Sequence, residues 1–256
     1  STRVDFASGA ELRADNGTLS LAGEKLLHVG TLGTNDVDGV LEVTGDWNTA
    51  VTDLVELRGG SLIGGSVANA AGKRITGHGT VAAAGLTNDG QIDAGGGLLS
   101  IDTGNPADLD GAAGNGVLEA VLGDLAVLVP VTDAFDGIAS VAARRTMSFE
   151  QDWTLNTGGV LNLDGGPDPI TRAMVDGSRQ TLYGTVNADL ESHFDIETAF
   201  KSWVNVNLLD LNDVLRLYDD AHVEAGAAFH GDGTLFVAPG SALAAEHAAQ
   251  IDVHVQ

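Results

Sequence analysis

The chain contains no cysteine among its 256 residues. This absence excludes a disulfide framework, a zinc site with cysteine ligands and a thiol nucleophile. Basic residues are also scarce, with 12 Lys and Arg against 36 Asp and Glu, and the formal net charge is −24. A nucleic-acid groove and an anionic membrane surface both require clustered cations on the protein. The sequence therefore predicts no nucleic-acid partner.

Long apolar runs are missing as well. The most apolar region, residues 117–131, is interrupted by Glu119, Asp124 and Pro130, and a membrane-spanning helix needs about 20 apolar residues without such breaks. Residues 1–6 carry no charged segment followed by an apolar one, so a targeting signal is either absent or already removed. We expect no membrane insertion.

A short phrase, a glycine followed by small apolar residues in alternation, recurs about every twenty residues. It reads GTLSL at 17–21, GVLEV at 39–43, GSLI at 60–63, GTV at 79–81, GLLSI at 97–101, GVLEA at 116–120, GVLNL at 159–163, GTV at 184–186 and GTLFV at 233–237. Strand-length phrases between glycine-rich turns are typical of stacked coils of β-structure. The sequence predicts an all-β chain folded as a single-stranded right-handed parallel β-helix, or β-solenoid, with roughly twenty residues in each coil.

Alternate residues of the phrase should face one core, because successive side chains of a strand point to opposite faces. The predicted core residues are Leu19, Leu21, Leu41, Val43, Val81, Ile101, Leu161, Leu163, Val186, Leu235 and Val237.

One continuous solenoid is expected over residues 1–256, with regular coils at 1–120 and longer, looser coils at 121–256. Residues 241–250 allow two interpretations, a helix or a further coil. Both ends of the chain show strand patterns without a capping helix, and an open solenoid end exposes apolar surface and unpaired backbone. We therefore expect either a segment of a longer chain or a unit that assembles end to end, with neighbouring domains or copies of itself as partners at the ends.

Three stretches carry a family resemblance: ITGHGTV at 75–81, LTNDGQIDA at 86–94 and FHGDGTLFV at 229–237. They resemble the right-handed parallel β-helix passengers of bacterial autotransporters and related large surface adhesins. The resemblance implies a repetitive, secreted protein at the bacterial cell surface, and it includes no diagnostic catalytic motif.

Aspartate dominates the acidic residues, with 26 Asp against 10 Glu, and Asp favours turns. The simpler interpretation of these turn carboxylates is solubility in a salty medium. The alternative is calcium, which takes six to eight oxygen ligands. The best candidate calcium ligands are Asp102, Asn105, Asp108 and Asp110, although their spacing matches neither an EF-hand nor the nonapeptide calcium repeat.

Carboxylate pairs that could act as acid and base in glycan cleavage are dispersed. Asp133 and Asp136 have only Arg144 and Arg145 nearby in sequence as possible partners for an anionic substrate. The sequence thus predicts neither a catalytic residue nor an organic cofactor. The three tryptophans, Trp47, Trp153 and Trp203, could stack on sugar rings if exposed, but core packing is the commoner role.

Two functions remain open at this stage. The first is a non-catalytic, extracellular structural or adhesive segment of a bacterial surface protein, with a surface glycan or a protein receptor as partner. The alternative is a phage tail fibre or tailspike on a virion, a class that includes trimers, that binds or cleaves surface glycans. The mass in solution separates them, because a passenger segment is expected to be a monomer and a tail fibre a stable trimer.

Overall fold

The computed structural model describes the backbone of residues 2–5, 11–14, 25–30, 40–43, 45–51, 54–164, 173–177, 180–182, 184–189, 191–195, 198–200, 209–211, 214–217, 221–223, 228–237, 239, 242–245 and 250–255. Side chains are described at residues 41, 45–50, 54–164, 173–176, 184–186, 239 and 242. The chain divides into two compact units, Ser1–Thr132 and Asp133–Gln256. Parallel strands about 21 residues apart stack on one another, which confirms the predicted β-solenoid.

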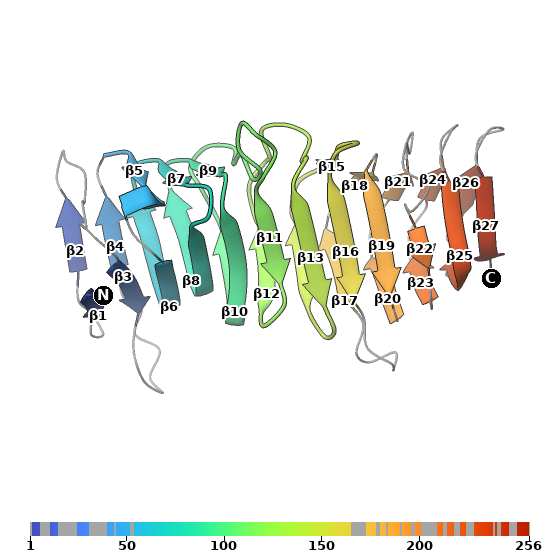
Figure 1. Ribbon diagram of the computed structural model, residues 1–256, viewed down its shortest axis with the longest axis horizontal. Helices are drawn as coiled ribbons and strands as arrows, with labels where there is room; N and C mark the ends of the chain where they lie inside the picture. The colour runs from blue at the N-terminus through green and yellow to red at the C-terminus, as the bar shows by residue number, and fades with distance from the viewer. Residues whose placement is uncertain are drawn as a thin grey trace. The chain divides into compact units, whose positions relative to one another are not determined.

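The described residues of the first unit form strands and one short 3-10 helix (Figure 1). Its elements are β1 (Thr2–Asp5), β2 (Glu11–Ala14), β3 (Lys25–Gly30), β4 (Val40–Val43), β5 (Trp47–Asn48), η1 (Thr49–Val51), β6 (Leu54–Gly64), β7 (Val67–Asn69), β8 (Arg74–Ala83), β9 (Leu86–Asn88), β10 (Gln91–Ile101), β11 (Val117–Ala120) and β12 (Asp124–Val127).

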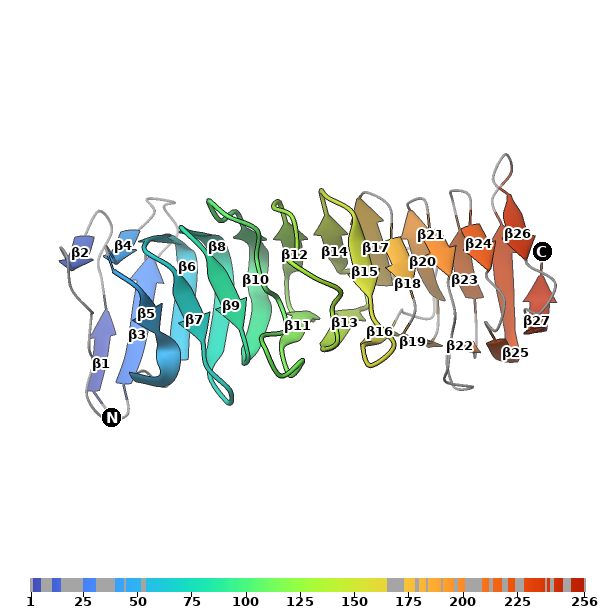
Figure 2. The same ribbon diagram turned by 90° about the horizontal axis from the view of Figure 1, so that it is seen from above.

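These strands lie in three rows, which Figure 2 shows from above. One row runs from β1 and β3 through the first halves of β6, β8 and β10 to β11. The second runs from β2 and β4 through the second halves of the same long strands to β12. The third contains β5, β7 and β9. The three successive coils that end in β5, β7 and β9 therefore contribute one strand segment to each of three faces.

Glycine allows the long strands to pass from the first row to the second. The register of β6 with β8 shifts between Arg58 and Gly60, beside Gly79 of β8. Gly79 has a φ of +129°, and a Cβ placed there would lie 2.1 Å from the carbonyl oxygen of Gly60 in the preceding coil. Only glycine combines this backbone conformation with so close an approach of two chains. At this position the glycine of the recurring phrase is therefore required, because the backbone turns the corner between two faces of the coil here.

The second unit repeats the three rows. Its strands are β13 (Ile138–Ala142), β14 (Thr146–Phe149), β15 (Trp153–Leu155), β16 (Val160–Asp164), β17 (Ala173–Gly177), β18 (Gln180–Leu182), β19 (Thr185–Asp189), β20 (Glu191–Asp195), β21 (Thr198–Phe200), β22 (Leu209–Leu211), β23 (Val214–Leu217), β24 (Ala221–Val223), β25 (Ala228–Val237), β26 (Leu243–Ala245) and β27 (Gln250–Val255). The rows are β13-β16-β19-β22-β25, β14-β17-β20-β23-β25 and β15-β18-β21-β24-β26, and β27 continues the first two from β25.

The helical interpretation of residues 241–250 is wrong over Leu243–Ala245. These residues form β26, which pairs in parallel with β24. A partner strand one coil earlier supplies backbone hydrogen bonds, and this outweighs the helix preference of an alanine-rich segment. No helix among the described residues has the length and apolar character needed to cross a membrane.

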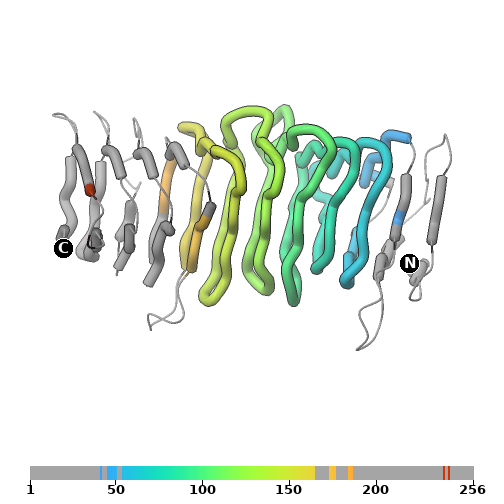
Figure 3. The backbone as a smooth tube through the Cα atoms, turned by 180° about the vertical axis from the view of Figure 1, so that it is seen from behind, coloured from blue at the N-terminus to red at the C-terminus, as the bar shows by residue number. Residues whose placement is uncertain are grey.

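In the first unit the backbone repeats a similar loop from coil to coil (Figure 3). In both units, apolar side chains at paired positions of successive coils form the core. In the first unit Val55 pairs with Ile75 and Ile75 with Ile92, and all three are 0% exposed. In the second unit Ala139 pairs with Leu161 and Leu161 with Val186, and all three are 0% exposed. Within one coil of that unit, Phe149 stacks on Trp153 with ring centroids 4.5 Å apart. Apolar side chains stacked in this way contact one another from coil to coil and exclude water from the core.

Every predicted core residue whose side chain the structure describes is buried. Those with described side chains are Leu41, Val81, Ile101, Leu161, Leu163 and Val186, and all are buried as predicted. Val43, Leu235 and Val237 lie in β4 and β25, where the backbone alone is described. Leu19 and Leu21 lie outside the described residues.

Candidate functional site

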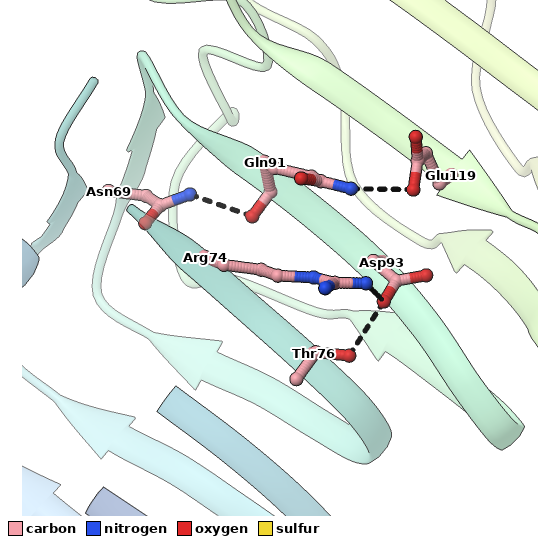
Figure 4. Close-up of polar contacts among 6 residues, drawn as sticks. All are labelled: Asn69, Arg74, Thr76, Gln91, Asp93 and Glu119. Atoms are coloured by element: carbon pink, nitrogen blue, oxygen red, sulfur yellow. Dashed lines mark hydrogen bonds and ion pairs between the residues drawn. The ribbon is translucent and has the colours of Figure 1, made fainter. Parts of the chain in front are cut away.

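Polar side chains gather on the outer face of the first row, where β8, β10 and β11 lie side by side (Figure 4). The strands place them there by alternation, because Ile75 and Ile92 face the core and their neighbours face outward. The register sets Gln91 opposite Arg74, and Asp93 opposite both Thr76 and Glu119. One cation, two carboxylates and an amide thus meet across three adjacent coils.

Asp93 is the most enclosed charge of this cluster. Its side chain is 3% exposed, against 44% for Arg74, whose guanidinium forms an ion pair with it. Thr76 donates its hydroxyl to the same carboxylate oxygen, Oδ2, at 2.7 Å. A buried carboxylate without such partners costs several kcal/mol. The guanidinium and the hydroxyl therefore stabilise Asp93 as a structural charge that joins β8 to β10.

Gln91 makes a second connection across the same face. Its Nε2 donates to Oε2 of Glu119 at 2.5 Å, which joins β10 to β11. Its backbone oxygen accepts from Nδ2 of Asn69 at 3.0 Å, which joins β10 to the end of β7. The amide and the main chain of one residue therefore contact two other coils.

A pocket opens beside this cluster, and we call it the Lys73–Asn115 pocket. Its volume is about 300 Å³, at the lower end of the range of about 300–1,000 Å³ for ligand pockets. It is lined by Gly72, Lys73, Arg74, Asp89, Gly90, Gln91, Asn115 and Val117. Three successive coils supply these residues, and both charge signs and two amides are represented among them.

Inside the first unit, a ladder of polar side chains runs along the ends of the third-row strands. Thr49 donates its hydroxyl to Oδ1 of Asn69 at 3.0 Å, and Nδ2 of Asn69 donates to Oδ1 of Asn88 at 2.7 Å. Nδ2 of Asn88 then donates to the backbone oxygen of Leu109 at 2.9 Å. All three side-chain members are 0% exposed. The ladder satisfies polar groups that would otherwise be buried at a cost, and it sets the spacing of neighbouring coils.

The structure separates the four predicted calcium ligands. Asp108 and Asp110 have carboxylate oxygens within 4.8 Å of one another, and Asp110 is 3% exposed. Oδ1 of Asp108 also accepts a hydrogen bond from the Gly111 N–H, three residues on, at 2.7 Å, so this carboxylate also stabilises its own turn. Nδ2 of Asn105 donates to the backbone oxygen of Ala84 at 2.6 Å, and Asp102 is exposed. Asp108 and Asp110 are thus the part of the set whose oxygens lie near enough to share a cation.

The carboxylates considered for glycan cleavage also have identifiable surroundings. Oδ2 of Asp136 accepts a hydrogen bond from Nδ2 of Asn156 at 2.9 Å, a contact between neighbouring coils. Asp133 and Arg144 are exposed, and Arg144 has a φ of +65°, which places it in a left-handed turn.

Two of the three tryptophans have described side chains, and both are buried. Trp47 and Trp153 are each 1% exposed, so both serve as core residues and neither presents a ring to a sugar. Trp203 lies outside the described residues.

Sequence reasoning did not identify the cluster of Arg74, Thr76, Asp93, Gln91 and Glu119. The signal was available in the alternation around Ile75 and Ile92. Aligning these two isoleucines as the same core position would have set Thr76 opposite Asp93. Comparison with protein-family models, with curated proteins and with solved structures finds no match to this chain.

Proposed function

We propose that this chain is a non-catalytic structural and adhesive segment of an extracellular bacterial surface protein of the kind that it resembles. The observation that carries the proposal is the direction of the polar contacts. Asn69 with Asn88, Arg74 with Asp93, and Gln91 with Glu119 each join one coil to the next. Side chains used in this way strengthen a stack of coils, which suits a scaffold that holds its shape outside the cell.

The charge of the chain supports the same function. A formal net charge of −24 keeps a repetitive β-protein soluble and discourages association between strand edges. The absence of cysteine leaves stability to stacking and hydrogen bonding, so the scaffold does not depend on the redox state of its surroundings. Both properties fit a surface location.

Adhesion is tested with beads that carry the purified chain. Beads coated with this chain and beads coated with albumin, a second acidic protein, are perfused over bacterial and epithelial cell layers at increasing shear. We expect several-fold greater retention of the chain-coated beads on at least one cell type. Equal retention of the two bead types on every cell layer would refute the adhesive part of the proposal.

Two further measurements distinguish the alternative function. Sedimentation equilibrium is expected to give the mass of a monomer, 26.1 kDa. A stable trimer would favour a tail fibre instead. Incubation with neutral and acidic polysaccharides should release no new reducing ends or unsaturated products, and release of either would overturn the non-catalytic assignment.

A further inference from the structure

Charged groups of both signs line or border the Lys73–Asn115 pocket. Among its lining residues, Lys73 and Arg74 are cationic and Asp89 is anionic. Two carboxylates lie just outside the lining: Asp93 forms an ion pair with Arg74, and Glu119 accepts a hydrogen bond from a lining amide. Because neither sign is in large excess, a ligand with a net charge gains little, and an uncharged polar ligand fits best.

The lining offers both donors and acceptors of hydrogen bonds. Lys73 supplies an ammonium donor, Asp89 supplies carboxylate acceptors, and the amides of Gln91 and Asn115 supply both kinds. Nε2 of Gln91 is already engaged with Glu119, so its Oε1 is the end available for a ligand donor. A sugar hydroxyl donates one hydrogen bond and accepts others, so a polyhydroxylated ring can bind both the donors and the acceptors of the pocket.

Backbone hydrogen bonds hold the walls of the pocket in place. The Lys73 N–H donates to the Ala70 oxygen, the Gln91 N–H to the Lys73 oxygen and the Val117 N–H to the Gly90 oxygen, at 2.8 to 2.9 Å. The Asn115 N–H donates to the Asp110 oxygen at 3.0 Å. Ordered walls lower the cost of binding because little main chain has to be immobilised by the ligand.

We propose that the Lys73–Asn115 pocket binds one uncharged pyranose residue of a surface glycan. Its volume of about 300 Å³ suits a single ring. Val117 and the α-carbons of Gly72 and Gly90 supply the apolar wall for the C–H groups of the sugar. A pyranose would be the ligand class of the adhesive function proposed above, and this assignment of the pocket rests on that function.

The test is a titration of the folded, isotope-labelled chain followed by amide chemical shifts. The probes are methyl α-mannopyranoside, methyl β-galactopyranoside and N-acetylglucosamine, with galacturonate and glucosamine as charged comparators. We expect at least one neutral sugar to give saturable shifts at Lys73, Gln91 and Asn115. Both charged comparators should bind more weakly.

Two variants and a matched control make the assignment specific. Asn115→Ala and Lys73→Met should each weaken binding about fivefold, the effect of losing one hydrogen bond of about 1 kcal/mol. Gln151→Ala removes an exposed amide in the second unit and should leave binding unchanged. Thermal melts of the three variants confirm that each is folded.

Three results would overturn the inference: no saturable shifts with any neutral sugar, tighter binding of a charged comparator, or equal loss of affinity in Gln151→Ala. The bead assay separates this failure from failure of the proposed function. If the beads are retained but no sugar binds, only the pocket assignment is overturned. If the beads are not retained and no sugar binds, the adhesive function is overturned as well.

Discussion

Replacement of Asn69 by alanine tests whether the polar ladder stabilises the stack of coils. Asn69 accepts a hydrogen bond from the Thr49 hydroxyl and donates to Asn88 Oδ1 and to the Gln91 backbone oxygen. Alanine removes all three contacts and leaves a small void at a position that is 0% exposed. The substitution therefore changes the contacts of three different coils at once.

The expected loss is about 2–4 kcal/mol in the free energy of unfolding. Each ordinary hydrogen bond contributes about 0.5–1.5 kcal/mol, and a buried group that loses its partner costs about 1–3 kcal/mol. Asn156→Ala is the control, because Asn156 is half-buried and makes one such contact, with Asp136. It should cost less than about 1 kcal/mol.

Urea unfolding followed by circular dichroism at 218 nm, a wavelength for β-structure, gives the required free energies. A double-mutant cycle of Asn69→Ala with Asn88→Ala should show a coupling of about 0.5–3 kcal/mol, because the two side chains are directly bonded. A loss as small as that of the control, together with additive effects in the cycle, would refute the idea that the ladder stabilises the stack.

Three other outcomes are expected. Leu161→Ala, at a position that is 0% exposed, should cost about 2–5 kcal/mol in urea unfolding, and a cost under about 1 kcal/mol would contradict its place in the core. Gly116→Ala should destabilise the chain strongly, because its Cβ would lie 2.4 Å from two backbone oxygens. Gly104→Ala is the control and should be nearly neutral, because the nearest atom to its Cβ would lie 3.5 Å away. Equal melting temperatures of the two variants would count against this packing argument. The melting temperature should rise with salt, because the chain carries a formal charge of −24. Millimolar Ca²⁺ should raise it further than NaCl of equal ionic strength if the turn containing Asp108 coordinates the ion, and coincident melts would leave screening alone.

The sequence was sufficient to predict the solenoid and much of its core. The repeated phrase places Val81 and Leu161 on inward positions by simple alternation, and both are buried. What alternation does not supply is the register between coils of unequal length. Gln91 pairs with Arg74 seventeen residues earlier and with Val117 twenty-six residues later. A fixed period therefore misaligns these strands.

The same uncertainty in register explains why the pocket and the ladder were not predicted. Lys73 and Asn115 belong to turns in different coils, and only the folded stack brings them to one pocket. Asn88 could be recognised in the sequence as a turn residue, but its amide is buried against Asn69 and Leu109. Turn propensity alone does not distinguish an asparagine that faces solvent from one that faces the next coil.

The ladder of Thr49, Asn69 and Asn88 makes part of this chain modular. Each asparagine makes the same kind of contact with the coil before it and the coil after it. A gene can therefore gain or lose such a unit by in-frame duplication or deletion while the remaining joints keep their chemistry. At Leu109 a main-chain oxygen takes the place of the next side-chain amide, so the series of equivalent side-chain contacts ends at this coil. Variation in length is expected before that point, and variation in individual side chains after it.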